Sequence, residues 1–187
     1  MTRVTKNDWL EEGLTVLEQL GVAGLTLETL TQRLGVTTGS FYHHFKNQPD
    51  YQTQLLAYWE EAATQAVIRA SEAEPTPEAV FHRIMALSLA RPSDPETALR
   101  LWATQNPEVR EAVARVDHQR LSYGDTLFAA IVGDAHRGRV LTRLLYAILI
   151  GSRQMLPPLG NDALEELIHE FERLLTRSGE NNDAVAE

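Results

Sequence analysis

The residues between positions 37 and 46 carry side chains that can form hydrogen bonds with DNA. Threonine and serine hydroxyls can bond base edges or phosphates, and a threonine methyl group can meet the methyl group of thymine. Tyrosine, histidine and lysine side chains can hold phosphate oxygens. The residues concerned are Thr37, Thr38, Ser40, Tyr42, His43, His44 and Lys46, and Gly39 among them would let the helix approach the DNA closely. Their pattern indicates a DNA-binding surface, although the polar side of an ordinary helical hairpin would also fit it.

Two short helices joined by a tight turn are expected to position these side chains. Thr26 is a suitable N-cap for a helix over residues 27–34, and the free backbone N–H groups at that end suit a further phosphate. Gly35 can adopt the left-handed conformation that ends a helix. Phe41 and Phe45, four positions apart, should anchor the next helix to the first helix of the chain. Such a pair of helices is typical of a helix-turn-helix, in which the second helix enters the major groove.

Helical periodicity continues through the whole chain, and no segment alternates as a half-buried strand does. We expect an all-α protein of about nine helices, with a three-helix N-terminal head and a C-terminal helical bundle. The expected domains are a helix-turn-helix domain over 1–46 and a ligand-binding and dimerisation domain over 47–178. The second domain begins with a long connecting helix over 47–72, and a disordered tail follows over 179–187. The remaining helices are expected over 7–20, 77–90, 107–132, 139–155 and 161–177, with short ones after Thr37 and after Asp94-Pro95.

The composition fits a folded intracellular protein. Hydrophobic residues make up 43% of the 187, and the absence of cysteine excludes disulfides and thiolate metal sites. The polar residues 1–7 lack the apolar core of a secretion signal, and the most apolar run, Leu144 to Gly151, is too short to span a bilayer. We therefore expect a cytoplasmic protein that does not enter a membrane.

The charge of the chain limits how it can bind DNA. The net charge is −9, and the first fifty residues contain four basic residues against six acidic ones. DNA binding must therefore come from the local placement of donors and not from bulk charge. We expect Arg3 and Lys6 to add positive charge from a flexible N-terminal arm.

Four segments of the N-terminal part form a specific pattern, namely Leu14–Gly24, Thr26-Leu27-Glu28-Thr29-Leu30, Leu34-Gly35-Val36 and Gly39-Ser40-Phe41-Tyr42-His43-His44-Phe45. Through these segments, residues 9–59 resemble the DNA-binding head of the TetR (tetracycline-repressor-like) family. The remainder of the chain resembles that family in helix number, order and length, and the segment from Leu99 to Leu121 also looks like one branch of it. One departure is Thr38, which stands just after the recognition-helix cap, where a basic residue is common.

The resemblance implies a homodimeric transcriptional regulator that binds a double-stranded DNA operator. It implies that Thr26 and the residues named above between positions 37 and 46 lie at or near the DNA. It also implies dimerisation through the helices over 139–156 and 162–177, and an effector in the body that changes the separation of the two heads. The connecting helix over 47–72 is the natural lever, because it joins head to body.

Several large side chains in the second domain could line a pocket for a small apolar or amphipathic effector. As a set they are richer in large and adaptable residues than a tight bundle needs. For any one of them an ordinary place in the core is the simpler interpretation, and Arg120 could instead pair with Asp117 on the same helix. The candidates are Phe81, Met85, Trp102, Arg120, Tyr123, Phe128 and Tyr146.

Catalytic and metal-binding patterns are not found in the sequence. There is no nucleophile elbow, phosphate loop or paired-carboxylate motif. His43 and His44 are adjacent in a helix and point about 100° apart, so they cannot easily share one metal ion. We therefore expect no enzyme, cofactor or metal, but a repressor released by its effector. The alternatives are a protein-interaction module whose helix-turn-helix no longer binds DNA and, less favoured, an all-α enzyme.

Overall fold

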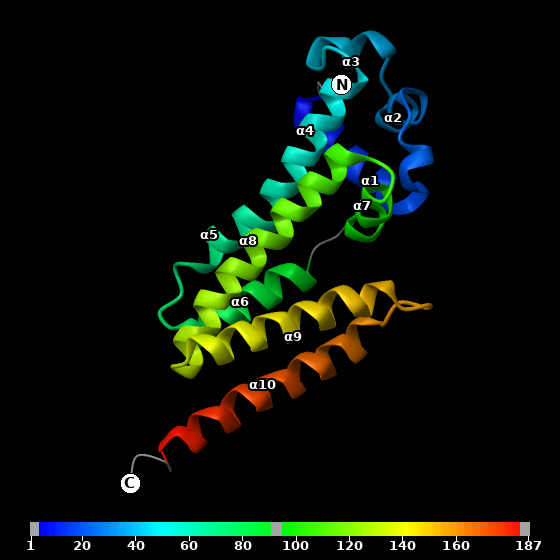
Figure 1. Cartoon of the computed structure of the whole chain (residues 1–187). Coiled ribbons are helices and arrows are strands. Elements are labelled where there is room, and N and C mark those ends of the chain that lie inside the picture. The colour runs from blue at the N-terminus through cyan, green and yellow to red at the C-terminus, as the bar shows by residue number, and fades with distance from the viewer. Residues whose placement is uncertain (1–3, 91–94, 184–187) are drawn as a thin grey trace. The chain divides into compact units, whose positions relative to one another are not determined.

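The computed structural model describes residues 4–90 and 95–183, with side chains up to residue 175 (Figure 1). Counting α4, η1 and α5 as one continuous helix, the described residues form nine helices and no strand, which confirms the predicted all-α fold. No helix in the described part of the chain combines the length and apolar character needed to cross a membrane. The elements are α1 (Lys6–Gly24), α2 (Leu27–Leu34), α3 (Thr38–His44), α4 (Gln48–Glu60), η1 (Glu61–Gln65), α5 (Ala66–Ser71), α6 (Pro77–Leu89), α7 (Glu96–Ala103), α8 (Pro107–Val132), α9 (Ala135–Gln154) and α10 (Asn161–Asp183).

The chain folds into two compact units, each with its own hydrophobic core. The first unit contains residues up to Val67 together with Ala90–Val116, and the second contains Ile68–Leu89 together with Asp117–Glu187. This division differs from the expected boundary after residue 46. The reason is that the connecting helix does not leave the head at once: Tyr51, Leu55 and Trp59 are all buried in the core of the first unit. Helix α8 contributes its first half to one unit and its second half to the other.

The core of the first unit forms around α1, which packs against α2, α4 and α7. The apolar stripe of α1 at Leu10, Leu14 and Leu17 is buried, as its i, i+4, i+7 spacing predicts. Hydrogen bonds at the rim connect α4 to the start of α8, where the hydroxyl of Thr53 donates to Glu108 Oε1 at 2.6 Å. The first unit is therefore a head of three helices enlarged by α4, α7 and the start of α8.

Helix α1 starts and ends differently from the prediction. Thr5, and not Asn7, is its N-cap: the Thr5 hydroxyl accepts from Asp8 N at 3.3 Å, and Asp8 Oδ2 accepts from Thr5 N at 2.6 Å. At Gly21, expected to end the helix, φ is +66°, yet helical structure resumes and continues to Gly24. Lys6 therefore lies in the first helical turn and not in a flexible arm, whereas Arg3 lies outside the described residues.

The connecting helix begins as predicted but contains an unexpected turn. Asn47 caps it by accepting from Asp50 N at 2.9 Å, and Pro49 lies in the first turn. The helix ends at Ser71, close to the predicted end at residue 72. Between Glu61 and Gln65 the chain forms a π-helical turn, which holds one more residue per hydrogen-bonded loop than an α-helix. Nothing in the local residue pattern predicted this turn.

The second unit consists of the end of α5 from Ile68, α6, the second half of α8, α9 and α10. Its core is centred on three aromatic rings: Phe128 lies 5.5 Å from Phe81 and 5.4 Å from Phe171, centroid to centroid. Helix α9 begins four residues before the expected start, because the Asp134 side chain accepts from Arg137 N at 2.6 Å and caps it there. Helix α10 continues to Asp183, so residues 179–183 are helical where a disordered tail was expected. Residues 184–187 of that tail lie outside the described part of the chain.

Candidate nucleic-acid interface

The turn between α2 and α3 has the geometry that its residues predict. The Thr26 hydroxyl accepts from Thr29 N at 3.1 Å and so caps α2. Gly35 ends α2 in the left-handed conformation, with φ +66°. The backbone N–H of Val36 then donates to the carbonyl oxygen of Thr31 at 3.0 Å, which satisfies a carbonyl group left free at the end of the helix. The chain thus turns sharply and starts α3 within three residues.

Helix α3 is anchored by aromatic side chains on its inner side. Phe41 and Phe45 are only 2% and 1% exposed. Both rings meet the ring of Trp9 on α1 edge to face, at centroid distances of 5.4 and 6.5 Å. The ring of Tyr51 on α4 completes the cluster, 5.5 Å from Phe41 and 4.9 Å from Phe45. The predicted anchoring of this helix to α1 is confirmed, and it prevents α3 from rotating about its axis.

The other side of α3 is exposed. Gly39, Tyr42 and His43 are exposed, with Tyr42 at 60%, while Ser40 and His44 are half-buried. Thr37 is exposed and makes no capping hydrogen bond with its side chain, so its hydroxyl is not used to start the helix. The remaining predicted residues, Thr26, Thr38 and Lys46, are exposed as well. The structure therefore brings all nine predicted DNA-contacting residues to the surface of one small region formed by α2, α3 and the turn after it.

In the described part of the chain, Lys6 and Lys46 bring positive charge near α3. Lys6 Nζ lies 5.9 Å from the centre of the Phe45 ring, which places it beside the end of α3. Lys46 follows α3, and its backbone N–H donates to Asp50 Oδ2 at 2.8 Å. This bond, with a further one from the Gln54 side chain, lowers the pKa of Asp50, and the charges of Lys46 and Lys6 lower it further. Both lysines therefore act on the same carboxylate.

Arg33 is held away from such a role. Its Nε lies 2.7 Å from Glu12 Oε1, and its terminal nitrogen donates to Gln19 Oε1 at 2.6 Å. These contacts connect α2 to α1. The guanidinium thus stabilises the packing of the head.

Trp9 and Tyr51 are the two residues of this site that the sequence reasoning did not select. The Tyr51 hydroxyl donates a hydrogen bond of 2.9 Å to the carbonyl oxygen of Trp9, and burial, with the nearby charge of Glu12, raises the pKa of that hydroxyl. The spacing of Tyr51, Leu55 and Trp59 by four could have identified Tyr51 as a core residue. Trp9 precedes the leucine stripe of α1 by one position, and so no periodic pattern singled it out.

The seven residues expected around an effector do not form one cluster. Phe81, Met85 and Phe128 are buried in the core of the second unit. Trp102 belongs to the first unit, where it packs half-buried against that core. Tyr146 donates a hydrogen bond of 2.6 Å to Asp117 Oδ1.

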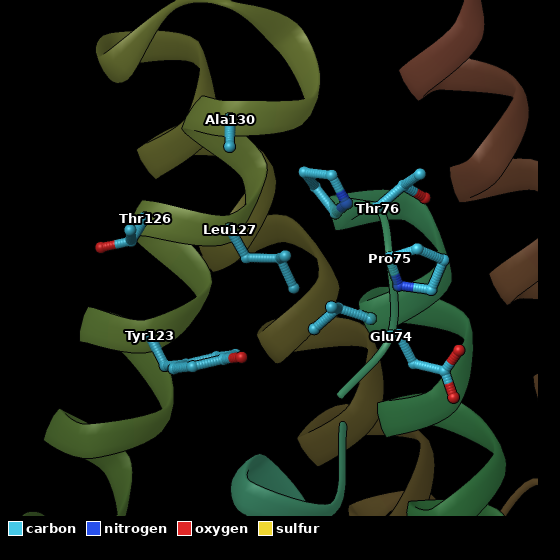
Figure 2. A pocket seen from close by; sticks show the side chains of 9 residues that line it. Glu74, Pro75, Thr76, Tyr123, Thr126, Leu127 and Ala130 are labelled. Carbon is cyan, nitrogen blue, oxygen red and sulfur yellow. The ribbon is translucent and has the colours of Figure 1, made fainter. Parts of the chain in front are cut away.

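The other two residues of that set, Arg120 and Tyr123, lie on the second half of α8. Tyr123 is on the wall of a cavity of about 310 Å³ in the second unit, and Arg120 is not among the residues that line it (Figure 2). Tyr123 is thus the member of the predicted set that the structure places at this cavity.

The comparisons with known proteins agree with this geometry. Residues 10–48, which include most of α1 and all of α2 and α3, match the family model of bacterial regulatory proteins, tetR family. No curated protein matches the sequence significantly. Among solved structures, a TetR-family transcriptional regulator from Streptomyces coelicolor matches with a TM-score of 0.75 at 17% identity, over 91% of this chain and 94% of that chain. At this level of identity the likeness shows a common fold.

The family model and the fold comparison cover different parts of the chain. The model matches the segment whose aromatic anchor and glycine turn build the helix-turn-helix. The fold comparison extends over nearly the whole chain and includes the helices that follow the head. Residues 10–48 therefore form the DNA-binding helix-turn-helix described by the family model of bacterial regulatory proteins, tetR family, and the chain as a whole has the fold of a TetR-family transcriptional regulator.

Proposed function

We propose that this regulator is a homodimeric repressor that binds a near-palindromic operator through α3 and is released by a small apolar or amphipathic effector. The observation that carries the DNA-binding part is the construction of α3. Its inner side is fixed by Phe41 and Phe45 against Trp9, and its outer side exposes polar groups and a glycine. A recognition helix needs both properties, because it must be rigid to hold its register and open to reach base edges.

The proposed contacts divide into base-reading and phosphate-binding residues. Thr37, Thr38, Gly39 and Ser40 form the start of α3, which in a helix-turn-helix lies nearest the bases. Tyr42, His43, His44 and Lys46 have longer side chains with hydrogen-bond donors that suit phosphates. Thr26 caps α2, and the backbone N–H groups at that helix end favour one more phosphate. This division predicts that the first group sets sequence preference and the second sets overall affinity.

Pairing of two copies through α9 and α10 is supported by the apolar side chains that these helices expose. Val140 and Leu144 on α9 are 53% and 41% exposed, and Leu167 and Leu174 on α10 are 39% and 40% exposed. The two helices lie side by side in the second unit (Figure 1). A two-fold axis beside them would bury this face against its own copy in a four-helix arrangement. Such a dimer must hold its two recognition helices about 35 Å apart, or a multiple of that distance, to enter successive major grooves.

The proposed effector acts by favouring a different separation of the two heads. An effector that binds more tightly to the head separation that does not fit the operator weakens DNA binding. The coupling free energy between effector binding and DNA binding is typically about 1–3 kcal/mol. Binding and release of DNA would then depend on the concentration of the effector in the cell.

Operator selection from random DNA, followed by titration of the selected duplex, tests the proposal. Thr38→Ala and Tyr42→Phe should each weaken operator binding by about fivefold to a hundredfold, since each removes a hydrogen bond to DNA. Thr97→Ala is the matched control, because Thr97 is exposed on α7, outside α2 and α3. Unchanged affinity in both head variants would refute the proposed surface. Failure to select any duplex would favour a protein-interaction module, which is the alternative that the acidic head suggests.

A further inference from the structure

Lysine is rare in this chain, and both lysines lie beside the proposed recognition helix. The 187 residues contain fifteen arginines but only two lysines, Lys6 and Lys46. Both lysine side chains are exposed. Lys46 follows α3 closely, and Lys6 Nζ lies 5.9 Å from the centre of the Phe45 ring at the end of that helix. A reagent that modifies lysine and not arginine would therefore change the side chains of this protein next to α3.

Acylation is a reaction that distinguishes lysine from arginine. A lysine amine that has lost its proton is a nucleophile, whereas the guanidinium group of arginine keeps its proton in proteins. Cysteine, whose thiolate would compete for an activated acyl group, is absent from the sequence. The two lysines are therefore the side chains on which an acyl group would form a stable amide.

We propose that Lys6 and Lys46 are acetylation sites through which activated acetyl groups control DNA binding. The lysine nitrogen loses its proton to water and attacks the carbonyl carbon of an acetyl thioester or of acetyl phosphate. An amide N–C bond forms, and the bond from that carbon to sulfur or to the phosphate oxygen breaks. A thiol or inorganic phosphate leaves, and the reaction needs no oxidant or reductant.

Acetylation removes the positive charge of each lysine, and at Lys6 it also removes the attraction of that charge to the Phe45 ring. The head has little charge to replace it. Arg33 is the one arginine within residues 4–46, and its guanidinium is already held by Glu12 and Gln19. Because the chain carries a net charge of −9, the loss of two charges beside α3 should weaken binding to DNA phosphates.

The inference rests on the proposed function for its regulatory consequence, because it takes α3 as the helix that binds DNA. The reaction at the two amines can be followed by mass in the absence of DNA. Operator binding can be measured on protein that has not met an acetyl donor. The two proposals can therefore fail separately.

Incubation of the full-length protein with acetyl-CoA, and separately with acetyl phosphate, tests the reaction. Peptide mass mapping should find acetyl groups on both lysines, and a bound operator duplex should protect both from either donor. Absence of acetyl groups from both lysines with both donors would overturn the proposal. Equal acetylation with and without the operator would also contradict it, because the lysines would then lie away from the bound DNA.

Titration of the modified protein with the selected operator measures the consequence. We expect a loss of affinity of roughly fivefold for each acetylated lysine at physiological ionic strength, and a smaller loss as the salt concentration rises. If the unmodified protein binds the operator and the modified protein binds it equally well, the regulatory proposal fails while the DNA-binding proposal stands. If the unmodified protein selects no duplex, the proposed function fails and the regulatory consequence with it, and mass mapping still decides whether the two lysines accept acetyl groups.

Variants assign the effect to the two lysines. Lys6→Arg combined with Lys46→Arg keeps both charges and removes both amines, so acetyl donors should not change whatever affinity this double variant has for the operator. Adding Arg83→Lys to the double variant is the matched control, since Arg83 is exposed on α6 in the second unit. Acetylation at that position should be detected by mass and leave the operator affinity as it was. A loss of affinity in the double variant equal to that of the native protein would place the effect outside the two lysines and contradict the proposal.

Discussion

The hydroxyl group of Tyr51 donates a hydrogen bond of 2.9 Å to the backbone carbonyl oxygen of Trp9, across 42 positions of sequence. Tyr51 is in the first turn of α4 and Trp9 is in the first turn of α1. Both rings contact Phe41, at 5.5 and 5.4 Å, and so they enclose the inner side of α3. The orientation of the proposed recognition helix is thus fixed by the start of the helix before the motif and the start of the helix after it.

Replacing Tyr51 by phenylalanine should lower the free energy of unfolding by about 1 kcal/mol. The ring keeps its packing, and only a buried hydrogen bond is lost. Tyr58→Phe is the matched control, because the Tyr58 hydroxyl donates to Glu11 at 2.8 Å in an exposed position, and its loss should cost less than about 0.5 kcal/mol. Urea unfolding of both variants measures the difference. Equal losses in the two variants would show that the bond to Trp9 has no special role.

Gly39→Ala should stabilise the free protein and weaken its complex with DNA. A Cβ atom at Gly39 would meet nothing closer than the Thr37 hydroxyl at 3.7 Å, so alanine fits, and the higher helix propensity should add up to about 1 kcal/mol. The added methyl group would nevertheless stand on the exposed side of α3, where close approach to DNA is proposed. Thermal unfolding and operator titration measure the two effects.

Gly35→Ala provides the contrast to this variant. Gly35 has φ +66°, so alanine there should destabilise the protein by about 1 kcal/mol or more, although its Cβ would meet no atom within 4 Å. A Gly39→Ala protein that is more stable and binds the operator with unchanged affinity would disprove the close approach.

Lys6→Gln and Lys46→Gln should each reduce the salt dependence of DNA binding. Each phosphate contact that is lost reduces the steepness of the negative slope of log affinity against log salt concentration by about 0.9. Arg33→Gln is the control of equal charge change: it should leave the slope nearly constant and lower stability, because Arg33 contacts Glu12 and Gln19. Titrations at several salt concentrations decide the matter. A larger change of slope in the Arg33 variant than in the lysine variants would contradict the assignment.

Leu144→Glu should convert the proposed dimer into monomers and strongly weaken operator binding. Leu144 is 41% exposed on the apolar face of α9, and burying a carboxylate against its own copy would be unfavourable. Leu101→Glu is the matched control, since Leu101 is 69% exposed on α7 in the first unit and lies outside the proposed interface. Sedimentation velocity measures the mass of each protein. A native protein that sediments as a monomer at micromolar concentration would refute the interface.

Much of the helical order could be read from local residue patterns. Thr26, Thr76 and Asn106 each accept a hydrogen bond from the backbone N–H three residues later, and the starts of α2, α6 and α8 were predicted correctly. Capping depends on a few neighbouring residues, and so the sequence contains the necessary information. The exposed residues of α3 were predictable for the same reason, because Phe41 and Phe45 define the inner side of so short a helix.

The sequence by itself determined the all-α class, the helix-turn-helix and the residues proposed to face DNA, since each depends on residues within one or two turns. Only the tertiary structure decided that Trp9 and Tyr51 hold α3 and that α4 belongs with the head. It also decided that Phe81 lies in the core of the second unit, whereas Tyr123 lies on the wall of a cavity. These outcomes depend on which helix faces pack together. Residues far apart in the chain compete for the same interior volume, and no local pattern records the result of that competition.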